Sequence, residues 1–229
     1  LSLDTISNTT GKMVGPIFGG WLLANVGISG EFTGAYIFVV ALHVINLGVV
    51  TRLRIPRSLS EESSESVLRG LWTAIGFALH SRTLLGLLYI TIVMNTLAFP
   101  VQQFIPAIGR DHLDVGVALV GLLVAAEGIG QLSGAGLIAL KRNVRYHGRI
   151  FALGSVSICV ITFIWVWSPW YAVTFALLAI GGIGQSGFGT MQSAVTLLAS
   201  PPELRGRMMG LLSFCIGVGT PIGGLEMGA

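Results

Sequence analysis

The sequence predicts an all-α, polytopic helical membrane protein with about seven transmembrane helices. Of the 229 residues, 53% are hydrophobic and only 10% are charged, and the mean hydropathy is +0.82. A soluble domain carries about 25% charged residues, so nearly the whole chain is expected to lie in a bilayer. Apolar segments of roughly the length that a span requires lie at about residues 1–26, 33–51, 83–107, 115–140, 149–167, 170–199 and 207–229.

The positions of lysine and arginine predict how these segments are oriented. All but two of the 13 basic residues fall in three alternate connections, 52–82, 141–149 and 200–207. The exceptions are Arg110 and Lys12. Because cytoplasmic loops of membrane proteins are enriched in lysine and arginine, we expect these three connections to be cytoplasmic. We also expect a multi-pass protein of the plasma (inner) membrane.

The first segment carries a regular glycine pattern with a proline inside it. Glycines at every fourth position line one face of a helix and allow a neighbouring backbone to approach closely. The proline removes one backbone donor and bends the helix. The pattern predicts a hinge or a sealing contact, and plain helix packing is the alternative. Its residues are Gly11, Gly15, Pro16, Gly19 and Gly20.

The connection 52–82 and the segment after it are both unusual. Apolar residues recur at helical spacing from Val67 to Leu79, which indicates an amphipathic helix at the cytoplasmic interface or an extension of the next span. The segment 83–107 contains Pro100 and Pro106 together with the amides of Asn95 and Gln102. These residues favour a broken helix that lines a cavity, with hydrogen bonding between helices as the alternative.

Ionisable residues inside a membrane segment usually face a cavity or a partner, and two such residues are prominent. Glu127 lies midway along 115–140, and Gln131 follows one turn later on the same face. Glu127 could bind a coupled proton, meet a cationic substrate, or form a neutral hydrogen bond to another helix. Lys12 could attract an anionic substrate, pair with an acid, or extend its stem to the interface.

The last three segments carry weaker signals. Trp165, Trp167 and Trp170 are expected to form an interfacial aromatic belt. The segment 170–199 is rich in glycine, and its glutamines either line a pathway or serve packing alone. In the segment 207–229, Pro221 is followed by two glycines, much as Pro16 is.

Several functions are not expected. No nucleophile–base set, metal-ligand spacing or phosphate-binding loop is apparent, so we predict neither an enzyme, a bound metal nor a cofactor. The basic residues are dispersed through short loops, which argues against nucleic acid as a partner. The expected partners are a small-molecule substrate and the lipid bilayer, and the protein is expected to be a monomer.

Three stretches resemble one family of transporters. The spacing Gly-x-x-x-Gly-Pro-x-x-Gly-Gly at 11–20 is similar to the antiporter motif of drug–proton antiporters in the major facilitator superfamily. The stretch 201–210, which includes Arg205 and Arg207, together with Thr220–Gly224, resembles the loop and eleventh helix of the efflux branch that contains the enterobactin exporter. The run from Val67 to Leu85 resembles the approach to the seventh helix of that branch.

The resemblance implies an internal fragment with about seven of the twelve helices of a major facilitator fold. Residues 1–51 would be the last two helices of the N-terminal half, 52–82 the cytoplasmic central loop, and 83–229 the C-terminal half, truncated in its fifth helix. It implies proton-coupled efflux of a small organic or amphipathic solute by alternating access, with the proton gradient as the energy source.

Within such a fold, we expect roles for individual residues. Glu127, Gln131, Asn95 and Gln102 would face the cavity, Lys12 would bias it towards anionic or amphipathic compounds, and the glycine motif and Pro221 would act in gating. Proton-independent uptake or facilitated transport is an alternative function. A non-transporting membrane sensor or accessory subunit is another.

Overall fold

The structure is a computed structural model, and it describes residues 11, 14–15, 17–19, 21, 33–52, 67–140 and 146–228. Within these ranges the chain is helical and contains no strand, which confirms the predicted all-helical fold class. Five helical stretches in the described part are long and apolar enough to cross a membrane. They correspond to the third to seventh predicted segments and comprise Arg82–Asp111, Val117–Leu140, His147–Val166, Tyr171–Leu198 and Pro202–Glu226.

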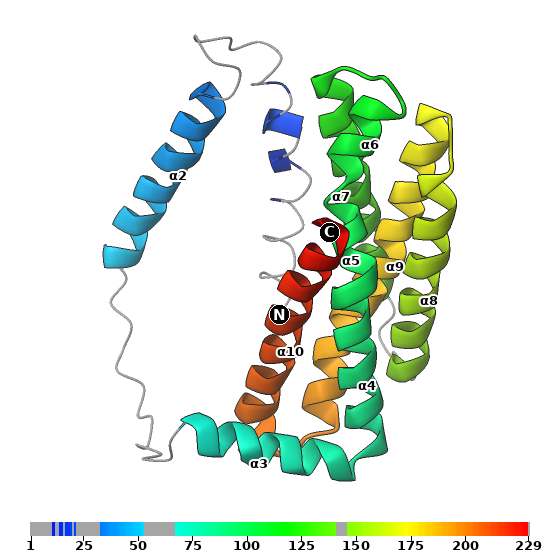
Figure 1. Cartoon of the computed structure of the whole chain (residues 1–229). Coiled ribbons are helices and arrows are strands. Elements are labelled where there is room, and N and C mark those ends of the chain that lie inside the picture. Colours follow the sequence, from blue (N-terminus) through cyan, green and yellow to red (C-terminus); the bar gives the residue numbers. More distant parts are fainter. Residues whose placement is uncertain are drawn as a thin grey trace.

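The second predicted segment forms α2 (Thr33–Arg52), which stands apart from the bundle in Figure 1. Its residues Tyr36–Arg52 form a further apolar helix in the described part of the chain. The described residues of the first segment are also helical, and Phe18 contacts Phe38 of α2 with ring centroids 4.9 Å apart.

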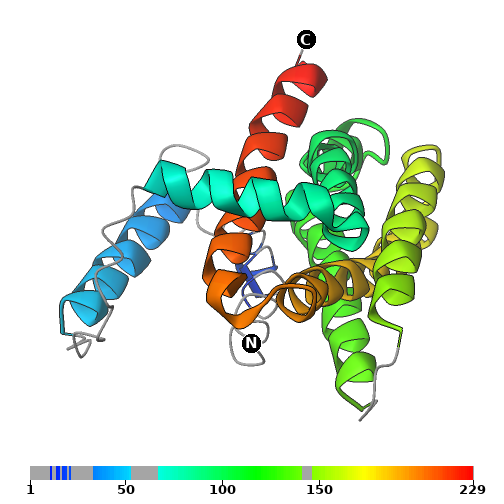
Figure 2. The same ribbon diagram turned by 90° about the horizontal axis from the view of Figure 1, so that it is seen from below.

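Helix α3 (Val67–His80) lies across one end of the bundle, as Figures 1 and 2 show from two directions. Ala74 and Ala78 are buried against the core, whereas Leu68, Trp72 and Leu79 are 61–70% exposed. The helix therefore presents an apolar face that the described residues leave uncovered. Ser81 ends the connection by capping the next helix, where its side chain accepts a hydrogen bond from the Leu84 amide.

The first of the five spans is interrupted, as its prolines predict. It consists of α4 (Arg82–Val93), a π-helical turn η1 (Met94–Ala98), α5 (Phe99–Gln102) and α6 (Ile105–Asp111). Pro100 and Pro106 lie in the first turns of α5 and α6, where a missing backbone N–H is tolerated. The last turn of α5 therefore ends inside the bundle and places a polar side chain, Gln102, there.

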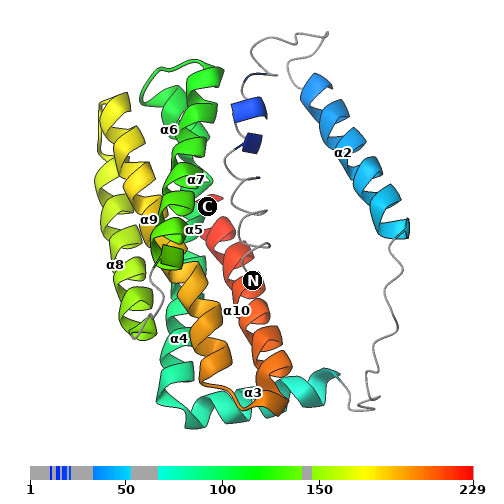
Figure 3. The same ribbon diagram turned by 180° about the vertical axis from the view of Figure 1, so that it is seen from behind.

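Three long helices form the other part of the bundle, α7 (Val117–Leu140), α8 (His147–Val166) and α9 (Tyr171–Leu198). Figure 3 shows them beside one another. Helix α9 meets α7 at Gly182 and α8 at Gly184, and at both positions a side chain would collide with the neighbouring helix. Small residues thus set the spacing of the three helices, as is typical of membrane bundles.

The chain closes with η2 (Pro202–Leu204) and α10 (Arg205–Gly228), which contains Pro221. Helix α10 packs along the interrupted span. A Cβ atom at Gly219 would lie 2.8 Å from the Cβ atom of Asn95, and one at Gly223 would overlap the carbonyl oxygen of Thr96. The π-helical turn and the glycines of α10 are therefore in direct contact.

The ends of the bundle differ in charge. The first turns of α4 and α8 and the start of α10 lie at the same end as α3 (Figure 1), and they carry Arg82, Arg149, Arg205 and Arg207. The described arginine at the opposite end is Arg110 of α6. The alternation of basic loops in the sequence thus corresponds to two ends of the folded bundle.

Candidate functional site

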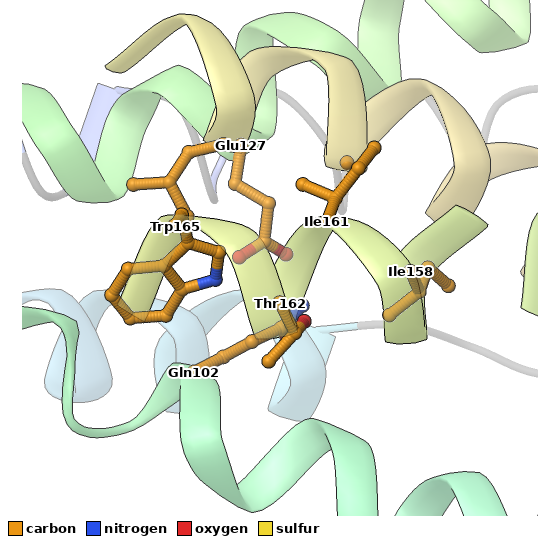
Figure 4. A pocket seen from close by; sticks show the side chains of 8 residues that line it. Gln102, Glu127, Ile158, Ile161, Thr162 and Trp165 are labelled. Carbon is orange, nitrogen blue, oxygen red and sulfur yellow. The ribbon is translucent and has the colours of Figure 1, made fainter. Parts of the chain in front are cut away.

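Glu127 lies near the middle of α7, and its carboxylate points into a pocket between helices (Figure 4). The pocket is bounded by four helical elements of the described chain, α5, α7, α8 and α9. Its other lining residues are Gln102, Ile158, Ile161, Thr162, Trp165, Leu178 and Gly181. The site is therefore lined by helices that come from distant parts of the sequence.

The backbone around Glu127 is held against α9 by small residues. A Cβ atom at Gly182 would overlap the carbonyl oxygen of Glu127, and one at Gly130 would overlap the carbonyl oxygen of Ala179. Since only glycine permits this approach, the two helices lie in close contact at the turn that carries Glu127 and Gln131. The crossing fixes the base of both side chains relative to α9.

A chain of polar side chains leads from Glu127 to α5. The amide nitrogen Nε2 of Gln131 donates to Oε1 of Glu127 at 2.9 Å, and it also donates to Oε1 of Gln185 on α9. The amide nitrogen of Gln185 donates to Oε1 of Gln102 at 3.4 Å. The structure thus brings three of the predicted site residues together and adds Gln185 as the link between them.

The pocket is small and mixed in character. Its cavity volume is about 10 Å³, roughly the space needed to hold the centre of one water molecule. Trp165 is only 1% exposed, and Figure 4 shows its indole nitrogen on the side of the Glu127 carboxylate. Thr162 adds a hydroxyl group to the lining. An organic solute does not fit in this space, whereas a proton on the carboxyl group does.

Asn95 belongs to a different polar group. Its side-chain amide donates to the carbonyl oxygen of Thr91 at 2.8 Å, and Gln192 of α9 donates to the hydroxyl oxygen of Thr91 at 2.6 Å. All three residues are buried. The bond from Gln192 joins α9 to α4, and no hydrogen bond among the described residues links Asn95 to the Glu127 chain.

The predicted gating residues are only partly described. Lys12, Pro16 and Gly20 lie outside the described residues. A Cβ atom at Gly11, Gly15 or Gly19 would meet no described atom within 4 Å, so the contact predicted for this face stays a prediction.

The remaining predicted residues lie on the surface or at the end of α10. Pro221 is exposed within α10. Arg205 is exposed and donates to the carbonyl oxygen of Leu197 at 3.2 Å. Arg207 is half-buried, and a Cβ atom at Gly70 of α3 would lie 3.8 Å from its Nε atom.

The pocket contains one residue, Trp165, that was expected elsewhere, and one, Thr162, that the sequence analysis did not identify. Trp165 was expected in the interfacial belt and is instead buried in the pocket, while Trp167 and Trp170 are 75% and 71% exposed. Thr162 shares a helical face with Trp165, since the residues of α8 that line the pocket recur at 158, 161, 162 and 165. That spacing is the signal that assigns both residues to an inward face.

Metal binding is not indicated by the described part of the chain, where no three His, Cys, Asp or Glu side chains come together. What the geometry defines is a helical membrane bundle with a carboxyl group held among amides in its interior. Such an arrangement is typical of membrane transporters.

The family is shown by sequence comparison. The model of the Major Facilitator Superfamily matches residues 1–224, and the chain therefore belongs to this family of membrane transporters. A curated relative, the magnetosome protein MamZ of Paramagnetospirillum magneticum (strain ATCC 700264 / AMB-1), is 24% identical in an alignment that covers 89% of this chain and 34% of MamZ. The chain thus spans about a third of the length of that relative. No solved structure matches the chain.

Proposed function

We propose that the chain is part of a secondary active transporter that exports a small organic or amphipathic solute in exchange for protons. The observation that carries this proposal is the placement of Glu127, which is the ionisable residue in the middle of α7 and points into a small pocket between helices. Ionisable groups at such depth are costly in a bilayer and usually serve a pathway. Membership of a transporter family supplies the context for that role.

Two features favour the proton over the solute as the ligand of Glu127. The cavity of about 10 Å³ leaves no room for an organic molecule. The carboxyl group also faces an amide, that of Gln131, and an amide can donate to a carboxylate or accept from a protonated carboxyl group. The site can therefore hold Glu127 in either protonation state. The solute would bind elsewhere, between the two halves of the transporter.

The remaining parts of the proposal concern regions beyond this pocket. Residues 1–51 and 83–229 would belong to two halves that rock about a central cavity. The glycine motif at 11–20, with Lys12 and Pro16, would seal the contact between them, as its resemblance to the antiporter motif implies. The basic connections would face the cytoplasm of a cell whose plasma (inner) membrane holds the protein.

Export from cells that express the full-length protein tests this proposal. A panel of cationic, anionic and neutral amphipathic dyes would be loaded, and their export followed with and without a protonophore. We expect at least one class of dye to be exported, and we expect the protonophore to stop that export.

Export that continues at the same rate with the protonophore would contradict proton coupling and favour a proton-independent carrier. If no dye is exported, with or without the protonophore, the result would favour a sensor or accessory subunit. A Lys12→Ala variant tested on the same panel shows whether Lys12 selects anionic dyes.

A further inference from the structure

Gln185 of α9 joins two parts of the bundle that have no covalent connection nearby. Its carbonyl oxygen accepts a hydrogen bond from Gln131 of α7, and its amide nitrogen donates to Gln102 of α5 at 3.4 Å. Gln102 is the last residue of α5, directly before the turn at Gln103 and Phe104 that separates α5 from α6. The side chain of Gln185 therefore connects Gln131, the hydrogen-bond partner of Glu127, to the residue before the break in the interrupted span.

The direction of donation along this chain is set by Glu127. A carboxylate only accepts hydrogen bonds, so Gln131 must turn its NH₂ group towards Glu127. The second hydrogen of that NH₂ group then points to Gln185, whose oxygen must accept it. Gln185 is left with its NH₂ group towards Gln102, which must present its oxygen. An ionised Glu127 thus fixes the orientation of three amides in sequence.

Protonation of Glu127 removes this constraint. A protonated carboxyl group gains an O–H donor, so the oxygen of Gln131 can accept from it. If each amide then reverses, Gln185 donates to Gln131 and Gln102 donates to Gln185, with the same number of hydrogen bonds. Two arrangements satisfy the protonated site, whereas the ionised site accepts only one.

We propose that Gln185 is a positioning residue that transmits the protonation state of Glu127 to the turn between α5 and α6. The inference rests on the proposed function, in which Glu127 takes up the coupled proton. When Glu127 on α7 is protonated, the amide of Gln102 is no longer held in one orientation through Gln185. The conformational freedom of the turn that follows Gln102 then changes. This gives the interrupted span a part in the coupling of proton binding to the conformational change.

The other described side chains that line the pocket carry no charge. From α5, α8 and α9 the pocket is lined by an amide, a hydroxyl group, an indole and apolar side chains. Helix α6, which also packs on α7, carries Arg110 and Asp111, and both are exposed at its outer end.

The test is a spin label on the exposed residue that follows Gln102, in the full-length protein reconstituted in nanodiscs. The variant Gln103→Cys, made in a protein that also carries Cys159→Ser and Cys215→Ser, is labelled with a nitroxide, and the mobility of the label is followed by electron paramagnetic resonance as the pH is lowered. We expect a change in mobility on acidification. We expect Gln185→Leu, which removes the bridge, and Glu127→Gln, which cannot ionise, each to abolish this change.

A matched control separates coupling from packing. Gln192 lies two turns further along α9 and donates a hydrogen bond to Thr91 of α4 at 2.6 Å. The variant Gln192→Leu therefore also removes a hydrogen bond between two helices, but it leaves the hydrogen bonds of the Glu127 chain intact. We expect this variant to keep the pH-dependent change. Elution of all variants as folded, monodisperse protein is the condition for the comparison.

The possible outcomes distinguish the two proposals. If Glu127→Gln abolishes the change while Gln185→Leu preserves it, the relay through Gln185 is wrong and Glu127 remains the proton site. If Glu127→Gln preserves the change, Glu127 is not the titrating group. Both the proposed proton-binding role of Glu127 and the relay through Gln185 would then be wrong. The relay would also be wrong if Gln192→Leu lost the pH-dependent change, or if the labelled Gln103→Cys protein without a second substitution showed no change.

Discussion

At the scale of single residues, the candidate site depends on glycines where α7 and α9 meet, and Gly182 is the one beside Glu127. Gly182 lies against the backbone of α7, and a Cβ atom there would overlap the carbonyl oxygen of Glu127 and lie 2.9 Å from the amide nitrogen of Gln131. These are backbone atoms, which cannot rotate away as the end of a side chain can. The glycine therefore keeps Gln131 within reach of Gln185.

The substitution Gly182→Ala tests this dependence. We expect it to push α9 away from α7, to lower the free energy of unfolding of the full-length protein by about 1–3 kcal/mol, as overpacking does, and to reduce export. Gly189→Ala is the matched control on the same helix, because a Cβ atom at Gly189 meets no described atom within 4 Å. Thermal unfolding of both variants in detergent gives the comparison. Equal stability of the two variants would show that the close crossing is not important.

The sequence allowed part of this site to be predicted. Glu127 and Gln131 are four residues apart on one helix, and their spacing alone predicts that their side chains meet, as they do at 2.9 Å. Gln185 could not be placed in the same way, because its contact with Gln131 depends on the register between α7 and α9. Asn95 carries an amide group, as the glutamines of the site do, but it lies against Gly219 of α10. Only the packing of whole helices determines that position.

At the scale of elements, prolines were a reliable guide to the interrupted span. Pro100 and Pro106 predict breaks, and α5 and α6 begin beside them. The π-helical turn Met94–Ala98 has no comparable residue signal, since none of its five residues lacks a backbone donor. It lies where Gly219 and Gly223 of α10 press against the span, and π-helical turns are frequent at functional positions.

Helix α3 illustrates a different limit of sequence analysis. Its apolar spacing predicts a helix, and the structure has one over Val67–His80. The spacing does not reveal that two apolar faces exist. One face, with Ala74 and Ala78, is buried in the bundle, while Leu68, Trp72 and Leu79 are exposed on the other. The exposed face is suited to the membrane interface, where a tryptophan is favoured.

At the scale of the whole molecule, the charge difference between the two ends of the bundle predicts its orientation. Single cysteines introduced at His112 and Glu203 lie at exposed positions of the two ends. We expect a membrane-impermeant maleimide to label His112→Cys in intact cells, and Glu203→Cys only after the membrane is permeabilised. The parent protein, with Cys159 and Cys215, sets the background. The reverse labelling pattern would contradict a cytoplasmic location of the α3 end.

The central claim for the whole molecule is that Glu127 carries the proton exchanged for the solute. Exchange requires that binding of the solute and of the proton oppose each other, and such coupling is reciprocal. The most direct measurement is therefore proton release by the purified full-length protein, in weakly buffered detergent, when an exported dye is added. We predict that the wild-type protein releases protons and that Glu127→Gln binds the dye without releasing any. Equal proton release by Glu127→Gln and the wild-type protein would contradict the claim.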